Sequence, residues 1–213
     1  MRFKAVIFDL DGVICFTDKY HYQAWKEIAD HEHIYFDEQI NNRLRGVSRM
    51  ESLEIILEKA NKKYTEAQKA KLAEVKNEIY RELLQTMTPA DLPVEVKETL
   101  DKLKGMGLKM AIGLSSKNAK LILSRIGLSD YFDAVSDGTN IQHSKPDPEV
   151  FLKAAEALGL APGECLVVED AQAGIVAAHR GGFHSAGIGE ASRFHLTDYS
   201  LLCIKDIIKV AES

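Results

Sequence analysis

The sequence has few cysteines, and basic residues are not in excess. Its three cysteines, Cys15, Cys165 and Cys203, lie far apart in 213 residues, so their spacing predicts neither a disulfide framework nor a zinc site. We expect Cys15 and Cys165 to be buried thiols. Lysine and arginine total 27 against 32 aspartates and glutamates, which gives a formal net charge of −5. A mildly acidic chain without a basic block is not expected to bind nucleic acid.

Long apolar runs are also missing. No stretch approaches the ~18 apolar residues that a membrane span requires. The first nine residues hold only a short apolar run before acidic residues appear, which does not predict a signal peptide. We therefore expect no membrane partner and a cytoplasmic location. We also expect a monomeric protein.

The composition that remains is typical of a folded domain, with 46% hydrophobic and 28% charged residues. The length allows one domain, or one domain that carries an insertion.

The apolar run at residues 3–8 stops at an Asp-Leu-Asp-Gly turn and predicts a buried strand. From about residue 18 to 85, charged segments show helical spacing and hardly any strand signal, with Ser48 and Thr65 as expected helix N-caps. Residues 88–93 are interpreted as a linker.

Beyond this linker, apolar strands alternate with amphipathic helices. Such alternation predicts a parallel sheet covered by helices on both faces. The expected fold class is α/β, with a doubly wound parallel-sheet core formed by residues 1–14 and 90–213 and an α-helical cap subdomain inserted at 15–89. In such sheets, ligands bind at the carboxyl ends of the strands. The predicted strands are 109–114, 132–136, 165–168 and 184–188, and the predicted helices are 94–104, 118–126, 148–158 and 171–180.

Paired carboxylates follow two of the predicted strands. Asp9 and Asp11 end the first strand, and Glu169 and Asp170 end the strand at 165–168. Each pair has a purely structural alternative, because aspartate favours turns and Asp170 is placed to cap a helix. Adjacent in space, the four would carry a charge of −4, which one divalent cation and one lysine would reduce to −1. The pattern therefore indicates a site for Mg²⁺ and phosphate.

Two further segments lie where a phosphate site would need them. Lys145 stands in Ser-Lys-Pro-Asp-Pro, where two prolines restrict the backbone after a candidate phosphate-binding ammonium. The alternative is a solvated surface lysine. The run Ser115-Ser116-Lys117-Asn118 follows a strand and opens a helix, so it could bind an oxyanion or act only as a cap.

These motifs together resemble the haloacid dehalogenase superfamily and, within it, the β-phosphoglucomutase family. The core motifs are FDLDGVI at 8–14, SSKN at 115–118, SKPDP at 144–148 and VVEDAQAGI at 167–175. The resemblance continues into the insertion through TDKYHYQAW at 17–25, LRGVSRMES at 44–52 and Lys76-Asn77. It therefore covers nearly the whole chain.

The resemblance implies a Mg²⁺-dependent phosphomutase that interconverts β-D-glucose 1-phosphate and β-D-glucose 6-phosphate through β-glucose 1,6-bisphosphate. It implies sugar phosphates as the only partners, with Asp9 as nucleophile, Asp11 as general acid–base and Lys145 neutralising the transferring phosphoryl group. Trp25 is interpreted as packing within the cap. The implied metal ligands are Asp9, Asp11, Glu169 and Asp170; the implied substrate-binding residues are Asp11, His21, Gly46, Val47, Arg49, Lys76, Ser116, Lys117 and Asn118, with Ser115 as a catalytic hydroxyl.

Two positions depart from the family pattern. Phe16 stands where the family usually carries aspartate, and Leu114 occupies the slot of the phosphate-binding hydroxyl. The second departure leads us to predict a slow enzyme, unless Ser115 has taken over that role. Two alternatives stay open: a sugar-phosphate phosphatase on the same fold, and a non-enzymatic phospho-acceptor domain, which would place its acceptor mid-chain and carry no helical insertion.

Overall fold

The chain divides into two compact units. The computed structural model describes residues 2–44 and 47–212. One unit, the core unit, comprises Met1–Phe16 and Thr88–Ser213, and the other, the helical unit, comprises Thr17–Met87. The predicted insertion, 15–89, extends two residues beyond the helical unit at each end.

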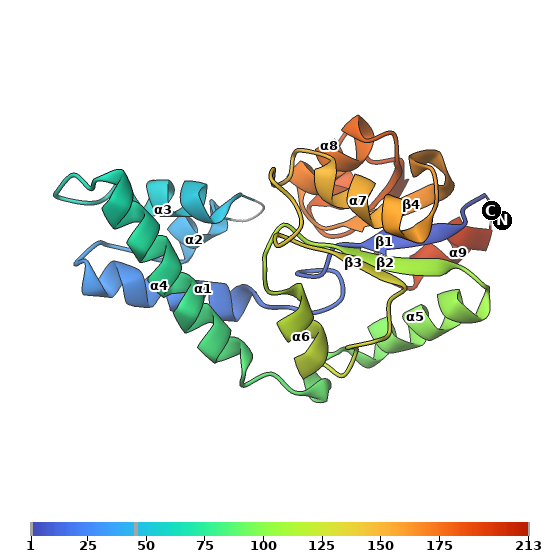
Figure 1. The fold of residues 1–213 in the computed structure, drawn as a ribbon, viewed down its shortest axis with the longest axis horizontal. Coiled ribbons are helices and arrows are strands. Elements are labelled where there is room, and N and C mark those ends of the chain that lie inside the picture. Colours follow the sequence, from blue (N-terminus) through green and yellow to red (C-terminus); the bar gives the residue numbers. More distant parts are fainter. Residues whose placement is uncertain (1, 45–46, 213) are drawn as a thin grey trace. The chain divides into compact units, whose positions relative to one another are not determined.

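The core unit is built on one six-stranded parallel sheet in the order β3-β2-β1-β4-β5-β6. Helices α5 and α6 lie on one face and α7 and α8 on the other (Figure 1), which confirms the predicted α/β class. The first strand lies in the middle of this sheet. All four of its residues are apolar and fully buried, as a position covered on both faces requires. The strands are β1 (Ala5–Phe8), β2 (Lys109–Gly113), β3 (Ala134–Ser136), β4 (Cys165–Glu169), β5 (His184–Gly187) and β6 (Tyr199–Ser200).

The helices of the core unit cover the sheet with apolar faces at helical spacing. In α7, the buried residues Phe151, Ala154, Ala155 and Leu158 pack with strand residues such as Ile7 in one cluster. Burying each large side chain contributes roughly 1.5–3 kcal/mol. The helices are α5 (Val94–Gly105), α6 (Ala119–Arg125), α7 (Glu149–Leu158), α8 (Gln172–Arg180) and α9 (Asp206–Glu212), with short 3₁₀ turns at Pro89–Asp91, Pro162–Glu164 and Ala191–Arg193.

Three features of the core unit differ from, or were absent from, the sequence prediction. The expected linker at 88–93 contains a 3₁₀ turn. Thr88 caps this turn: its hydroxyl accepts the backbone N–H of Ala90, and its own backbone N–H donates to Asp91. The N-cap of α8 is Ala171, so the alternative interpretation of Asp170 as that cap is wrong. The last strand has only two residues, too few to show a periodic pattern.

The helical unit has its own apolar core, formed where α1 and α3 pack against α4. Both predicted N-caps are confirmed: Ser48 and Thr65 each form a capping box with the residue three positions later. Within the described residues, no helix of either unit is long and apolar enough to cross a bilayer. The helices are α1 (Asp18–His31), α2 (Glu38–Asn42), α3 (Arg49–Leu57) and α4 (Glu66–Leu84).

Candidate active site

Three carboxylates meet at the carboxyl ends of the strands. Strands β1 and β4 pair in parallel with Phe8 opposite Val168, so Asp9 and Glu169 emerge side by side. One oxygen from each of Asp9, Glu169 and Asp170 lies within 4.8 Å of the others. Such hard oxygen ligands are the donor set that Mg²⁺ and Ca²⁺ prefer.

Lys145 reaches two of these carboxylates. Its Nζ donates to Asp9 and, at 2.5 Å, to Oε1 of Glu169. The side chain of Lys145 is 9% exposed and that of Glu169 is 1% exposed, so water screens the contacts little. The Phe151 ring lies 4.7 Å from the ammonium and completes its surroundings.

The charges of this cluster are unbalanced. Burial raises the pKa of Asp9 well above its ordinary value; the Lys145 ammonium opposes this shift, and the carboxylates of Glu169, Asp170 and Asp11 add to it. For Lys145, burial disfavours the ammonium, but the two carboxylates outweigh burial and raise the pKa. One lysine does not neutralise this much buried negative charge, so a bound divalent cation fits the residues present.

Two glycines that sequence reasoning did not single out make room for the carboxylates. Gly12 has φ +82°, and a Cβ there would lie 2.1 Å from Oδ2 of Asp170. A Cβ on Gly174, in the first turn of α8, would lie 1.9 Å from the carboxyl carbon of Glu169. Only glycine permits these approaches. The glycines in the motifs DLDG and AQAGI were the sequence feature that could have indicated them.

The SSKN segment lies at the end of β2, beside this cluster in the fold of the core unit. Ser115 Oγ accepts the backbone N–H of Lys145 at 3.1 Å, and Ser116 Oγ accepts the backbone N–H of Asn118 at 3.3 Å. Lys117 is exposed and Asn118 is buried. The Leu114 side chain is buried at 5% exposure. Ser115 thus links the strand end to the Lys145 backbone.

The remaining predicted residues belong to the helical unit. Arg49 is the first residue of α3, and its Nη2 donates to Oδ1 of Asn77 at 2.8 Å. Burial lowers the pKa of Arg49. Val47 is 38% exposed. Gly46, which was expected beside them, lies outside the described residues.

Four aromatic and basic side chains of α1 and α4 form a stack. Lys76 is 3% exposed, and its Nζ lies 2.8 Å from Nδ1 of His21. The same ammonium lies 4.9 Å from the Trp25 ring and 4.6 Å from the Tyr80 ring. His21 stacks on Tyr80 at 4.0 Å. The prediction brought His21 and Lys76 to one place but missed Tyr80, which lies one helical turn from Lys76.

A family model for haloacid dehalogenase-like hydrolases matches residues 3–182, so this chain belongs to that family. Family membership implies a divalent metal ion, in agreement with the carboxylate cluster. The chain is an enzyme, and the predicted resemblance to the β-phosphoglucomutase family is confirmed.

Two curated relatives and one crystal structure define the similarity more narrowly. The chain is 46% identical over 189 residues to the β-phosphoglucomutase of Bacillus subtilis, an alignment that covers 88% of this chain and 84% of the relative. It is 33% identical over 190 residues to the fructose-1-phosphate phosphatase of Escherichia coli, which covers 88% and 97%. The crystal structure of β-phosphoglucomutase from Clostridium difficile superposes with a TM-score of 0.89 at 37% identity, over 99% and 96% of the two chains.

Proposed function

We propose that this chain is a Mg²⁺-dependent phosphomutase that interconverts β-D-glucose 1-phosphate and β-D-glucose 6-phosphate. The observation that carries the proposal is the 46% identity to a β-phosphoglucomutase over 189 residues. This alignment is longer than the core unit, so it includes part of the helical unit, which in the proposal holds the substrate. Sugar phosphates are the proposed partners, and the proposed enzyme acts as a monomer.

Asp9 is the proposed nucleophile. Its carboxylate attacks phosphorus to form an aspartyl phosphate, while the bond from phosphorus to the sugar oxygen breaks. Asp11 donates a proton to that oxygen, and in the reverse direction it removes the proton from the attacking hydroxyl. Its position two residues after Asp9 supports this assignment.

Charge stabilisation is the proposed role of the remaining core residues. The buried ammonium of Lys145 stabilises the transferring phosphoryl group, and Ser115 to Asn118 bind its oxygens or the sugar. Asp9, Asp11, Glu169 and Asp170 would hold Mg²⁺. When bound, the ion would supply positive charge to the phosphoryl oxygens.

The helical unit is the proposed cap, which binds substrate and excludes water that would hydrolyse the aspartyl phosphate. Arg49 binds the phosphate that is not reacting, with Gly46 and Val47 beside it. His21 and Lys76 couple Asp11 to cap closure. The hydrogen bond that Arg49 donates to Oδ1 of Asn77 supports this role because it holds the guanidinium in one orientation.

A sugar-phosphate phosphatase is the second candidate, favoured by the 33% identity to the fructose-1-phosphate phosphatase. One assay separates the two: the purified enzyme is given β-glucose 1-phosphate, Mg²⁺ and a catalytic amount of glucose bisphosphate. Glucose 6-phosphate and inorganic phosphate are measured in parallel, with α-glucose 1-phosphate as the control substrate. The mutase proposal expects glucose 6-phosphate to form much faster than inorganic phosphate; release of inorganic phosphate at the same rate or faster would contradict it.

A further inference from the structure

The loop that delivers Lys145 has no regular secondary structure. Residues 137–148 connect β3 to α7, and Lys145 lies near the end of this loop. A lysine that must meet two buried carboxylates needs a fixed backbone, because a misplacement of about 1 Å can cost 10²-fold in rate. Side chains of the loop and of α7 hold this backbone.

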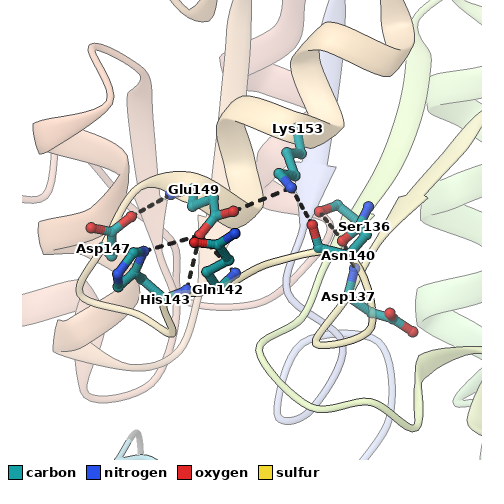
Figure 2. Close-up of polar contacts among 8 residues, drawn as sticks. All are labelled: Ser136, Asp137, Asn140, Gln142, His143, Asp147, Glu149 and Lys153. Atoms are coloured by element: carbon teal, nitrogen blue, oxygen red, sulfur yellow. Dashed lines mark hydrogen bonds and ion pairs between the residues drawn. The ribbon is translucent and has the colours of Figure 1, made fainter.

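Glu149, the first residue of α7, reaches back to the middle of the loop. Its Oε2 accepts the backbone N–H groups of Gln142 and His143, both at 2.9 Å (Figure 2). Its Oε1 pairs with Nζ of Lys153 at 3.2 Å, one helical turn later. The N–H groups of His143 and Gln142 hold the pKa of Glu149 at about 2, so the carboxylate is ionised at neutral pH.

Lys153 carries this network to the start of the loop. Its ammonium donates to the backbone carbonyl of Asn140. Asn140 Oδ1 in turn accepts the backbone N–H of Asp137 at 3.1 Å and the hydroxyl of Ser136 at 3.2 Å. Figure 2 shows this continuous path from the end of β3 to the first turn of α7.

His143, Asp147 and Glu149 also present possible metal-ligating atoms within 4.8 Å of one another. Both oxygens of Glu149 are already bonded, however, and Oδ1 of Asp147 accepts the backbone N–H of Glu149 at 2.9 Å. These hydrogen bonds hold the loop backbone and the start of α7. The arrangement therefore favours a structural role over an ion site.

We propose that Glu149 is a positioning residue for Lys145: by binding the amides of Gln142 and His143, it fixes the loop so that the Lys145 ammonium meets Asp9 and Glu169. The consequence for rate rests on the proposed function, in which Lys145 stabilises the phosphoryl group. The placement of Lys145 itself does not depend on that function.

The first experiment measures the placement of Lys145 without any activity. Lysines are acetylated with a small reagent, and the rate at Lys145 is followed by peptide mass spectrometry. In Glu149→Ala, acetylation of Lys145 should rise at least about tenfold, because one hydrogen bond to a charged group is worth about 10–150-fold in an equilibrium. Glu149→Gln keeps a carbonyl that can accept both N–H groups and should restore most of the protection.

Glu164 offers a matched control. Its Oε2 also accepts a backbone N–H, from Ala161 at 3.0 Å, and its Oε1 pairs with Lys4 at 2.6 Å. It precedes β4 and so lies at the amino end of that strand, whereas Glu169 lies at the carboxyl end. Glu164→Ala should leave the acetylation of Lys145 unchanged. Equal Lys145 protection in Glu149→Ala and the wild type would overturn the proposal. If Glu149→Ala does not fold, Glu149→Ser, which also removes the carboxylate, gives the same test.

The second experiment tests the consequence for rate with a small aryl phosphate. Glu149→Ala should lower kcat on the order of 10–10²-fold with little change in KM. In a Lys145→Met background, Glu149→Ala should lower kcat hardly any further, because both substitutions remove the same contribution, that of the Lys145 ammonium. Independent, additive losses would overturn positioning through Lys145. A changed acetylation rate with unchanged kcat in all variants would instead leave the positioning intact and refute the proposed role of Lys145.

Discussion

Each unit of this protein buries a lysine, and the two lysines contact different kinds of side chain. In the core unit, Lys145 contacts the carboxylates of Asp9 and Glu169. In the helical unit, Lys76 contacts the imidazole of His21 and the ring faces of Trp25 and Tyr80. A carboxylate pair binds a cation through full charges, whereas aromatic rings bind it through weaker quadrupoles.

The difference shows what each environment is suited to do. The core cluster has several ionisable groups whose charges depend on one another, so a phosphoryl group or a cation entering it changes all of them. The stack around Lys76 is made of rigid rings on two helices and holds the ammonium in place. We interpret the first as a reactive centre and the second as a rigid support for the proposed coupling of Asp11 to cap closure.

Removal of the proposed nucleophile, Asp9, should have the largest effect. Asp9→Asn keeps the side-chain volume but cannot form an aspartyl phosphate, so activity should fall by at least about 10³-fold. Lys145 would keep its contact with Glu169, so the fold should survive. Activity is measured as formation of glucose 6-phosphate from β-glucose 1-phosphate, and folding by circular dichroism. A folded Asp9→Asn enzyme with more than about one per cent of wild-type activity would refute the assignment.

A pair of lysine substitutions tests the comparison itself. Lys145→Met leaves two buried carboxylates without their ammonium, which should cost about 3–5 kcal/mol in the free energy of unfolding. Lys76→Met keeps an apolar side chain against the rings and should cost only about 0.5–2 kcal/mol. Urea unfolding measures both.

Added Mg²⁺ sharpens this test. A divalent cation near Asp9 and Glu169 should recover part of the stability that Lys145→Met loses, because it replaces the missing positive charge. The same Mg²⁺ addition should leave Lys76→Met unchanged. Equal costs for the two variants, with or without Mg²⁺, would mean that the two burial modes do not differ.

Arg49→Ala should have a smaller effect, confined to substrates with a second phosphate. A charged hydrogen bond of the kind proposed for Arg49 is worth roughly 1.5–3 kcal/mol, or about 10–150-fold. The mutase reaction should fall by that factor, and hydrolysis of an aryl phosphate should hardly change. Similar losses in both assays would show that Arg49 does not bind the distal phosphate. Arg43→Ala is the control, since Arg43 pairs with Glu58 at the surface.

Much of the core site could be predicted because it follows from strand ends. Asp9 follows β1 and Glu169 ends β4. Because these strands pair in parallel, their carboxyl ends lie together, and so do the residues placed there. The capped helices starting after Ser48 and Thr65 were predictable because a cap and its partner lie three residues apart.

What could not be predicted depends on contacts between distant residues or on irregular backbone. The bonds from Glu149 to Gln142 and His143 run within a loop whose path no periodicity describes. The position of Phe151 beneath the Lys145 ammonium results from the packing of α7, and a Cβ on Gly113 would lie 2.6 Å from that ring. The sequence showed an apolar residue and a glycine there without linking them.

The smallest predicted effect concerns an apolar residue beside the charged cluster. Leu114 directly follows β2, the strand next to β1, at the position where the resemblance leads us to expect a hydroxyl, and its side chain is buried. Leu114→Ser should raise the mutase rate at least about tenfold, since one donor in a preorganised site is worth on the order of 10²–10³. The same change should cost stability, because replacing a buried leucine by a small residue typically costs about 2–5 kcal/mol.

The alternative is that Ser115 already supplies the missing donor. Its hydroxyl accepts the backbone N–H of Lys145, and such a hydroxyl still has a proton to donate to a phosphoryl oxygen. Ser115→Ala would then lose rate on the order of 10²-fold, and Leu114→Ser would gain little. Single-turnover kinetics of both variants decide between the two. If Leu114→Ser is faster and Ser115→Ala is nearly unaffected, the buried leucine limits phosphoryl transfer in this enzyme, and its stability is gained at the expense of rate.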